Sequence, residues 1–306
     1  KPASQTPFSA LALAELADRA GLPAGVMSVL AGASSEIGEE MTANPIVRKL
    51  TFTGSTEGGK SVMKKCADTV KKANMELGGN APFIVFADAD MDAAVAGAVV
   101  CKFRNSGQTC VCANLFLVAD EVYDDFAARL AAEAKGLVCG DGMEEGVTQG
   151  PLINQQALEK VESHVADARE KGAELLTGGR PHKLGGAFYE PTVLAQATSD
   201  MRIFREETFG PVAALFRFKA EDEAVALAND TAYGLAAYVY TRDLGRAWRM
   251  SEALEYGIVG VNTGIISTEV APFGGVKESG LGREGAKYGM EEFLEIKYVC
   301  LGGIEA

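Results

Sequence analysis

A single thiol in a turn, Cys110, is the side chain of this sequence best placed to act as a nucleophile. It follows the run Asn105 to Thr109, whose residues are typical of turns, and the apolar run Leu115 to Val118 after it predicts a strand. A thiol on a loop that is held by a rigid strand is accessible to a substrate. The alternative is a small buried side chain, which is the usual role of a free cysteine.

A carboxylate that could serve this thiol lies upstream. Glu76 is followed by Leu77, two glycines and the apolar run 81–86, which predicts a buried strand. A carboxylate in an apolar pocket has a raised pKa and can take the proton of a thiol. Glu76 and Cys110 are therefore a candidate base and nucleophile, although a solvated charge is the alternative for Glu76.

The two motifs together resemble the aldehyde dehydrogenase superfamily. Glu-Leu-Gly-Gly occupies residues 76–79, Gly-Gln-Thr-Cys occupies residues 107–110, and the glycine-rich stretch 271–284 is a further match. The resemblance implies that Cys110 attacks an aldehyde to give a thiohemiacetal and that hydride passes to a nicotinamide. Glu76 then activates water to hydrolyse the thioester. We interpret the glycines of 271–284 as a structural loop, with a phosphate cradle as the alternative.

The cofactor choice depends on Lys1 and Ser4. In the family this Lys reaches the adenosine ribose, and a Glu commonly stands three residues later, where this sequence has Ser4. A Glu there would repel a 2′-phosphate, whereas Lys and Ser supply a charge and a small donor to it. The sequence therefore favours NADP over NAD.

Other cofactor contacts are implied by the resemblance. Gly54 and Ser55 precede a predicted helix, whose N-terminus favours a phosphate, although a plain loop is the alternative. Leu77 is assigned to the cofactor as well. The Glu-x-Phe-Gly-Pro motif assigns Glu207 to the nicotinamide ribose and Phe209 to packing on the nicotinamide. A dinucleotide fingerprint of the Gly-x-Gly-x-x-Gly kind is absent from the sequence, as the family's variant cofactor fold implies.

The resemblance narrows to the succinate-semialdehyde dehydrogenase branch, on Phe-Arg-Asn before the thiol and Cys-Val-Cys at it. Arg104 could hold the distal carboxylate of succinic semialdehyde in a fork of N–H donors, and Ser267 could add a hydrogen bond. An ion pair within the protein is the alternative role of Arg104. A dehydrogenase for glutarate semialdehyde would share every core motif.

Cys112 lies two residues from the nucleophile, so a strained Cys110–Cys112 disulfide could switch activity off; a packed thiol is the alternative.

The six cysteines show neither zinc-like spacing nor a disulfide framework, which favours a reducing, cytoplasmic compartment and no metal. The two histidines, His164 and His182, stand in polar sequence and are predicted to lie on the surface, which disfavours a Cys-His hydrolase.

The composition disfavours several classes of partner. The 306 residues include 29 Lys and Arg against 42 Asp and Glu, a formal net charge of −13. This charge disfavours nucleic acid and anionic membranes as partners. The longest apolar stretch, 93–100, is far shorter than the ~20 residues that cross a bilayer, so we expect a soluble protein.

The pattern of strand, glycine turn and helix predicts an α/β fold with parallel strands, as in aldehyde dehydrogenases. We expect strands at 26–30, 47–53, 83–86 and 115–118, and helices at 7–20, from 32, from 54 to Lys72, at 90–103, 121–135 and 155–171. The 155–171 helix is interpreted as a solvated charged face.

Three regions follow from the resemblance. Residues 1–78 would form a partial dinucleotide-binding domain, 79–278 the catalytic domain, and 279–306 a C-terminal segment. The strand 293–301 of that segment would join the sheet of a neighbouring subunit, which implies a homodimer or homotetramer. The family's second oxyanion donor and second substrate Arg would precede residue 1, so the chain is expected to be a catalytically incomplete C-terminal part.

Overall fold

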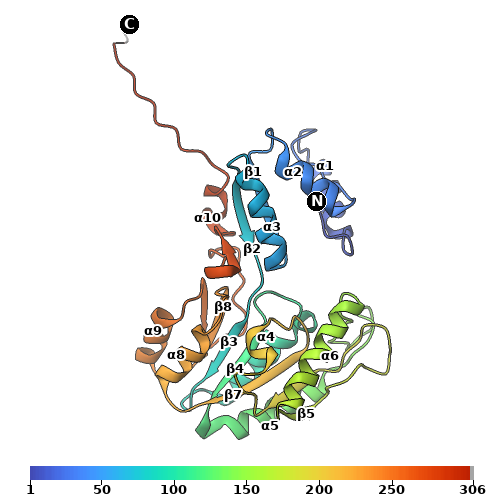
Figure 1. Cartoon of the computed structure of the whole chain (residues 1–306), viewed down its shortest axis with the longest axis vertical. Helices are drawn as coiled ribbons and strands as arrows, with labels where there is room; N and C mark the ends of the chain where they lie inside the picture. The colour runs from blue at the N-terminus through green and yellow to red at the C-terminus, as the bar shows by residue number, and fades with distance from the viewer. Residues whose placement is uncertain (304–306) are drawn as a thin grey trace. The chain divides into compact units, whose positions relative to one another are not determined.

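The computed structural model describes residues 1–303, which form two compact units, Lys1–Ala73 and the described residues from Asn74 onward. The first unit contains the helices α1 (Phe8–Arg19), α2 (Ser34–Ala43) and α3 (Thr56–Ala67) and the strand β1 (Lys49–Thr53) (Figure 1). The strand β2 (Lys72–Glu76) crosses from the first unit into the second. No helix within residues 1–303 has the length and apolarity needed to cross a membrane.

Two predictions for the first unit are wrong. Residues 26–30 form no strand, and Val26, Met27 and Leu30 are exposed. Apolar residues form a strand only where a neighbouring strand completes their hydrogen bonds, and this segment has none within 1–303. The third helix ends at Ala67 rather than Lys72, because Val70 turns to a left-handed φ of 51° ahead of β2.

The second unit is built on a seven-stranded sheet in the order β5-β6-β7-β4-β3-β8-β9 (Figure 1). All neighbouring pairs are parallel except β5–β6. The strands are β3 (Ala81–Val85), β4 (Ala113–Ala119), β5 (Glu174–Thr177), β6 (Thr192–Ala195), β7 (Val212–Phe218), β8 (Ala236–Tyr240) and β9 (Ile258–Val261). The helices are α4 (Met91–Phe103), α5 (Tyr123–Gly136), α6 (Gln155–Glu170), α7 (Arg202–Arg205), α8 (Glu221–Asn229), α9 (Leu244–Ala253) and α10 (Ala286–Glu291). The α/β fold with parallel strands is confirmed.

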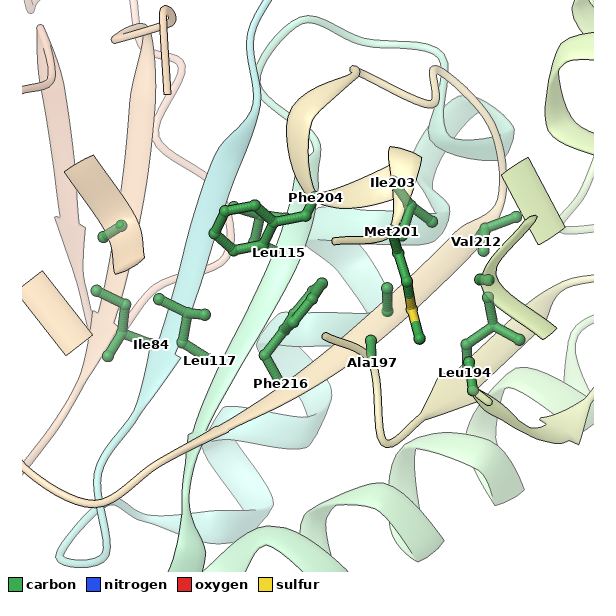
Figure 2. Close-up of a cluster of buried hydrophobic side chains, with 14 of the residues drawn as sticks. Ile84, Leu115, Leu117, Leu194, Ala197, Met201, Ile203, Phe204, Val212 and Phe216 are labelled. Carbon is green, nitrogen blue, oxygen red and sulfur yellow. The ribbon is translucent and has the colours of Figure 1, made fainter. Parts of the chain in front are cut away.

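Helices cover both faces of this sheet, which is why its central strands are apolar throughout rather than alternating. All seven residues of β4 are buried. On one face Phe116 and its neighbours pack against α4 and α5, and on the other Leu115 and Leu117 pack in the cluster formed with α6 to α9. Figure 2 shows this second cluster, where Phe204 lies near Leu115 and Phe216. The rigid sheet therefore carries the loops that leave its strands.

The C-terminal region contributes one short strand. β10 (Gly280–Leu281) pairs antiparallel with β2, with Gly280 opposite Glu76. The strand predicted at 293–301 has no partner strand in the described part of the chain, where residues 294–301 follow α10 as an exposed segment without regular secondary structure (Figure 1). Because a strand is defined by its partner, the pairing with another subunit stays a prediction.

Candidate active site

The loop that carries Cys110 begins at the C-terminal end of α4. Asn105, Ser106 and Gly107 take left-handed φ angles of 51°, 55° and 74°. Such a run is unusual for residues other than glycine, and it bends the chain sharply back toward β4. A Cβ on Gly107 would collide with the carbonyl of Gly210, so only glycine fits at this contact. The loop is thus a fixed turn rather than a flexible connection.

Hydrogen bonds to the segment 150–153 hold this turn in place. The Ser106 hydroxyl donates to the Gly150 carbonyl at 2.8 Å, and Gln108 Oε1 accepts from the Ile153 N–H at 2.8 Å. Ser106 is buried and Gln108 is half-buried. The thiol that follows is therefore presented by a supported loop, as the sequence predicted.

Cys110 is half-buried, and its pKa is raised to about 11. Burial is the main cause, and the carboxylates of Glu207 and Glu76 add to it by repelling a thiolate. Gly79 packs so closely that a Cβ there would collide with the Cys110 carbonyl. The structure thus brings Glu76, Glu207 and Cys110 together, and the isolated thiol is protonated at neutral pH.

Glu76 ends β2 and is 4% exposed, with no hydrogen-bond partner for its buried Oε2 among the described residues. Its pKa is raised to about 8, mainly by burial and then by Glu284, while Arg283 opposes the shift. A carboxylate that titrates near neutral pH and has a free oxygen is suited to proton transfer. These properties match the base that the sequence assigned to Glu76.

The glycine-rich stretch 271–284 holds the backbone around Glu76. The Leu77 N–H donates to the Ser279 carbonyl at 2.9 Å, and the Ser279 hydroxyl donates to the Gly78 carbonyl at 2.7 Å. Gly280 has a φ of 142°, and a Cβ there would collide with the Met75 carbonyl. These hydrogen bonds and close contacts fix the backbone on both sides of Glu76. The stretch is therefore a structural loop, which is the interpretation that the sequence favoured.

Lys277 of this stretch is committed to structural contacts. Its Nζ pairs with Glu255 at 2.5 Å and donates to the carbonyls of Asn229 and Thr231 at 3.2 and 3.3 Å. The ammonium thereby caps the C-terminal end of α8. It is not free to bind a phosphate.

The segment after α7 contains Glu207 and Phe209. Glu207 Oε1 accepts from the Gly79 N–H at 3.0 Å, which fixes the carboxylate beside the Cys110 loop. Phe209 has a left-handed φ of 53° and is 36% exposed. A bulky residue in this conformation costs about 1–3 kcal/mol and persists only where its surroundings hold it. The fixed Glu207 carboxylate and the strained Phe209 backbone are both typical of a segment that belongs to a functional site.

Buried amides brace the same segment. The Asn114 amide donates to the Ile203 carbonyl at 3.0 Å and to Asn80 Oδ1 at 2.6 Å, and its Oδ1 accepts from the Thr208 N–H at 3.3 Å. Asn80 and Asn114 are 0% and 2% exposed. Neither residue was predicted to belong to the site, although each lies at the start of a buried strand beside a site motif.

Arg104 is half-buried and forms no ion pair within residues 1–303, so the alternative role considered from the sequence is not observed. Its Nε is buried without an acceptor. A buried guanidinium nitrogen without an acceptor is costly unless a ligand supplies one. Ser267 lies on an exposed loop, and no hydrogen bond joins it to Arg104 in the described part of the chain.

Cys112 is a buried free thiol whose sulfur lies 2.7 Å from the Thr109 hydroxyl oxygen. Lys102, at the end of α4, is 1% exposed. Burial lowers the pKa of Lys102, and the electrostatic influence of Cys112 opposes this. Sequence reasoning missed this ammonium near Cys112, since a lysine at a helix end is usually solvated.

The surface position predicted for His164 is wrong. Its side chain is 0% exposed on the inner face of α6, with Nδ1 3.1 Å from the Thr208 hydroxyl and Nε2 3.1 Å from Glu206. The buried residues of α6 recur at 158, 161, 164, 165 and 168, which is a helical stripe. That spacing could have indicated a buried His164 from the sequence alone. The many charged residues on the other face of α6 led instead to the prediction of a surface position.

In the first unit, Lys1 Nζ donates to the hydroxyls of Ser34 and Ser4 at 2.6 and 3.3 Å. Ser34 starts α2, and a pocket of about 350 Å³ beside it is lined by Ser4, Pro7, Gly32 and Ala33, among others. A Lys, two hydroxyls and a helix N-terminus fit a phosphate-bearing nucleoside. Sequence reasoning had not included Ser34.

Gly54 and Ser55 lie where the sequence predicted, directly before α3. The Ser55 hydroxyl accepts from the Gly58 N–H at 3.2 Å and caps the helix. Thr56 is buried, and its hydroxyl has no partner in the described part of the chain. This helix N-terminus therefore has an unsatisfied polar atom that a phosphate oxygen could serve.

A model described as the aldehyde dehydrogenase family matches residues 1–299, and the chain belongs to that family. The succinate-semialdehyde dehydrogenase of Burkholderia pseudomallei has the same fold, with a TM-score of 0.97 and 63% identity over 98% of this chain and 62% of that one. The family and fold that the motifs predicted are thereby confirmed.

Curated relatives carry three different names. The 3-sulfolactaldehyde dehydrogenase of Pseudomonas putida is 63% identical and covers 100% of this chain. The glutarate-semialdehyde dehydrogenase of Pseudomonas aeruginosa and the NADP(+) succinate-semialdehyde dehydrogenase of Escherichia coli are each 62% identical and cover 99%. This chain spans 63% of the length of each of the three.

Proposed function

We propose that this chain carries the nucleophile and general base of an NAD(P)-dependent aldehyde dehydrogenase that oxidises succinic semialdehyde to succinate. The observation that carries the substrate class is Arg104, a half-buried guanidinium without an ion pair in residues 1–303, six residues before Cys110. A distal carboxylate would give its buried Nε an acceptor. Ser267 would add a hydrogen bond from its exposed loop. The names of the relatives support an aldehyde with a distal anionic group.

Glutarate semialdehyde is the second candidate. It carries the same carboxylate one methylene further from the aldehyde, and a relative of equal identity is named for it. One methylene in a pocket discriminates by only about 10–200-fold, so the two substrates differ in preference rather than in mechanism.

Cys110 would attack the aldehyde carbon to form a thiohemiacetal, with the thiol proton passing to Glu76. The backbone N–H of Cys110 would donate to the developing oxyanion. The nicotinamide, when bound, supplies the hydride acceptor that converts the thiohemiacetal to a thioester. After releasing the thiol proton to solvent, Glu76 would take a proton from the water that attacks the thioester, and the Cys110 thiolate would leave as succinate forms.

The cofactor would be NADP, with NAD as the alternative. Lys1, Ser4 and Ser34 would hold the 2′-phosphate, since their donors converge and no carboxylate is among them. Gly54 and Ser55 would approach the pyrophosphate. Glu207, Phe209 and Leu77 would contact the nicotinamide end, consistent with the fixed Glu207 carboxylate.

Cys112 would act as a redox partner of Cys110. Its place two residues after Cys110, as a free thiol, supports the proposal. We propose further a cytoplasmic homodimer or homotetramer joined through the strand 293–301, with a dinucleotide-binding domain at 1–78, a catalytic domain at 79–278 and the C-terminal segment 279–306.

NADPH formation from succinic semialdehyde under reducing conditions tests the proposal. The 306-residue chain is assayed alone and joined to the part of the Escherichia coli relative that it does not match. Activity of the joined protein that prefers succinic over glutaric semialdehyde is the expected result. Activity with neither aldehyde, with NAD also tried, would refute the substrate assignment.

A further inference from the structure

The segment Glu206 to Gly210 needs support from outside itself, because Phe209 holds a left-handed φ of 53°. Two residues of α6 supply it. A Cβ on Gly210 would collide with Val161, and one turn further His164 contacts the Thr208 hydroxyl. Residues three apart lie on one face of a helix, so the same side of α6 touches the segment at both points.

The hydrogen-bond partners of His164 fix its tautomer. Nε2 lies 3.1 Å from Glu206 Oε2, and a carboxylate can only accept, so the proton of the neutral imidazole is on Nε2. Nδ1 is then an acceptor for the Thr208 hydroxyl at 3.1 Å. Burial lowers the pKa of His164; Glu206 opposes this, while Lys160 and Arg202 add to it.

We propose that His164 is a positioning residue for the segment Glu206 to Gly210, called the cofactor segment below. Glu206 orients the imidazole, the imidazole holds the Thr208 hydroxyl, and Asn114 holds the Thr208 N–H, so Thr208 is fixed at both its side chain and its backbone. The residues on either side of Thr208 are Glu207 and Phe209. Their role at the nicotinamide rests on the function proposed above, whereas the bracing of the segment does not.

The bracing is tested on the 306-residue chain without any assay of activity. His182→Gln leaves His164 as the only histidine, because the sequence contains two. Its ¹⁵N shifts should show a protonated Nε2, a bare Nδ1 and a pKa below the ordinary 6.5. The opposite tautomer, or a pKa at or above 6.5, would overturn the assignment.

Thr208→Val removes the hydroxyl at constant size, and Thr208→Ser is the matched control that keeps it. Amide hydrogen exchange of residues 206–209 should accelerate about tenfold in Thr208→Val and remain near the parent rate in Thr208→Ser. His164→Asn, whose Oδ1 can replace Nδ1 as the acceptor, should exchange more slowly than His164→Leu. Equal exchange in Thr208→Val and Thr208→Ser would refute the bracing role.

The role at the cofactor is tested in the joined protein. Thr208→Val should raise KM for NADP about tenfold while KM for the aldehyde stays unchanged, and Thr208→Ser should behave as the parent. Accelerated exchange with unchanged cofactor kinetics would overturn the positioning role. An inactive parent would refute the proposed function instead, and the NMR and exchange results would still decide whether His164 braces the segment.

Discussion

Replacing Glu76 with Gln should slow turnover by orders of magnitude and, in the same variant, stabilise the fold at alkaline pH. The substitution keeps the shape of the side chain and removes its titration. Burial raises the pKa of Glu76 to about 8 from its ordinary value of 4.5. The unfolded chain therefore ionises this group at lower pH than the folded chain does. Folding stability due to Glu76 is fully present below pH 4.5 and is lost as the pH rises toward 8.

The size of this effect follows from the two pKa values. At 1.36 kcal/mol per pH unit, the difference between 4.5 and about 8 corresponds to at most about 5 kcal/mol. Relaxation of the site and entry of water reduce this ceiling to a few kcal/mol. The unfolding free energy of the parent should therefore fall below that of Glu76→Gln progressively between pH 5 and 8, and the gap should be constant above pH 8.

Urea unfolding of both proteins from pH 5 to pH 9 measures this difference. Glu284→Gln is the matched control, since it removes a nearby carboxylate that is not assigned to proton transfer. In the joined protein Glu76→Gln should lower kcat by about 10²–10⁴-fold, whereas Glu284→Gln should retain activity. Parallel stability curves for the parent and Glu76→Gln would show an ordinary carboxylate and refute the argument for a buried base.

Three further substitutions test the remaining assignments. Arg104→Met should raise KM for succinic semialdehyde at least tenfold and affect an uncharged aldehyde of similar length far less, with Arg104→Lys intermediate; equal losses on both aldehydes would contradict carboxylate binding. Ser4→Glu should lower the ratio of NADP to NAD efficiency at least tenfold through repulsion of the 2′-phosphate, and an unchanged ratio would count against the site at Lys1. Cys112→Ala should make peroxide inactivation irreversible by dithiothreitol, and undiminished recovery would exclude the disulfide.

The strands that position the Cys110 loop could be predicted from the sequence, because their apolar composition and their burial on both faces point to the same structure. β3 and β4 are apolar on both sides, and a strand covered by helices on both faces needs just that pattern. The segments 26–30 and 293–301 are also rich in apolar residues, yet neither forms a strand. Whether these two segments form strands depends on the presence of a partner strand. The amino-acid composition of a segment carries no information about its partner.

The polar contacts inside the site were harder to predict because they join residues far apart in the chain. Asn114 meets Asn80 and Thr208, and His164 meets Glu206. Each of these side chains is ordinary in its local sequence. Only the fold makes them neighbours, because the parallel pairing of β3 with β4 places Asn80 and Asn114 at the same edge of the sheet.

The raised pKa values of Cys110 and Glu76 describe a nucleophile that is almost entirely protonated at neutral pH in the chain by itself. With a pKa of about 11, Cys110 is a thiolate in only about one molecule in ten thousand at pH 7. Moving its proton to Glu76, whose pKa is about 8, is uphill by about three pH units, or about 4 kcal/mol. The carboxylates Glu76 and Glu207 both repel the thiolate, so activation requires a positive charge or additional hydrogen-bond donors close to the sulfur. Because the charged groups that act on the Cys110 thiol are carboxylates, its reactivity depends on what binds beside it.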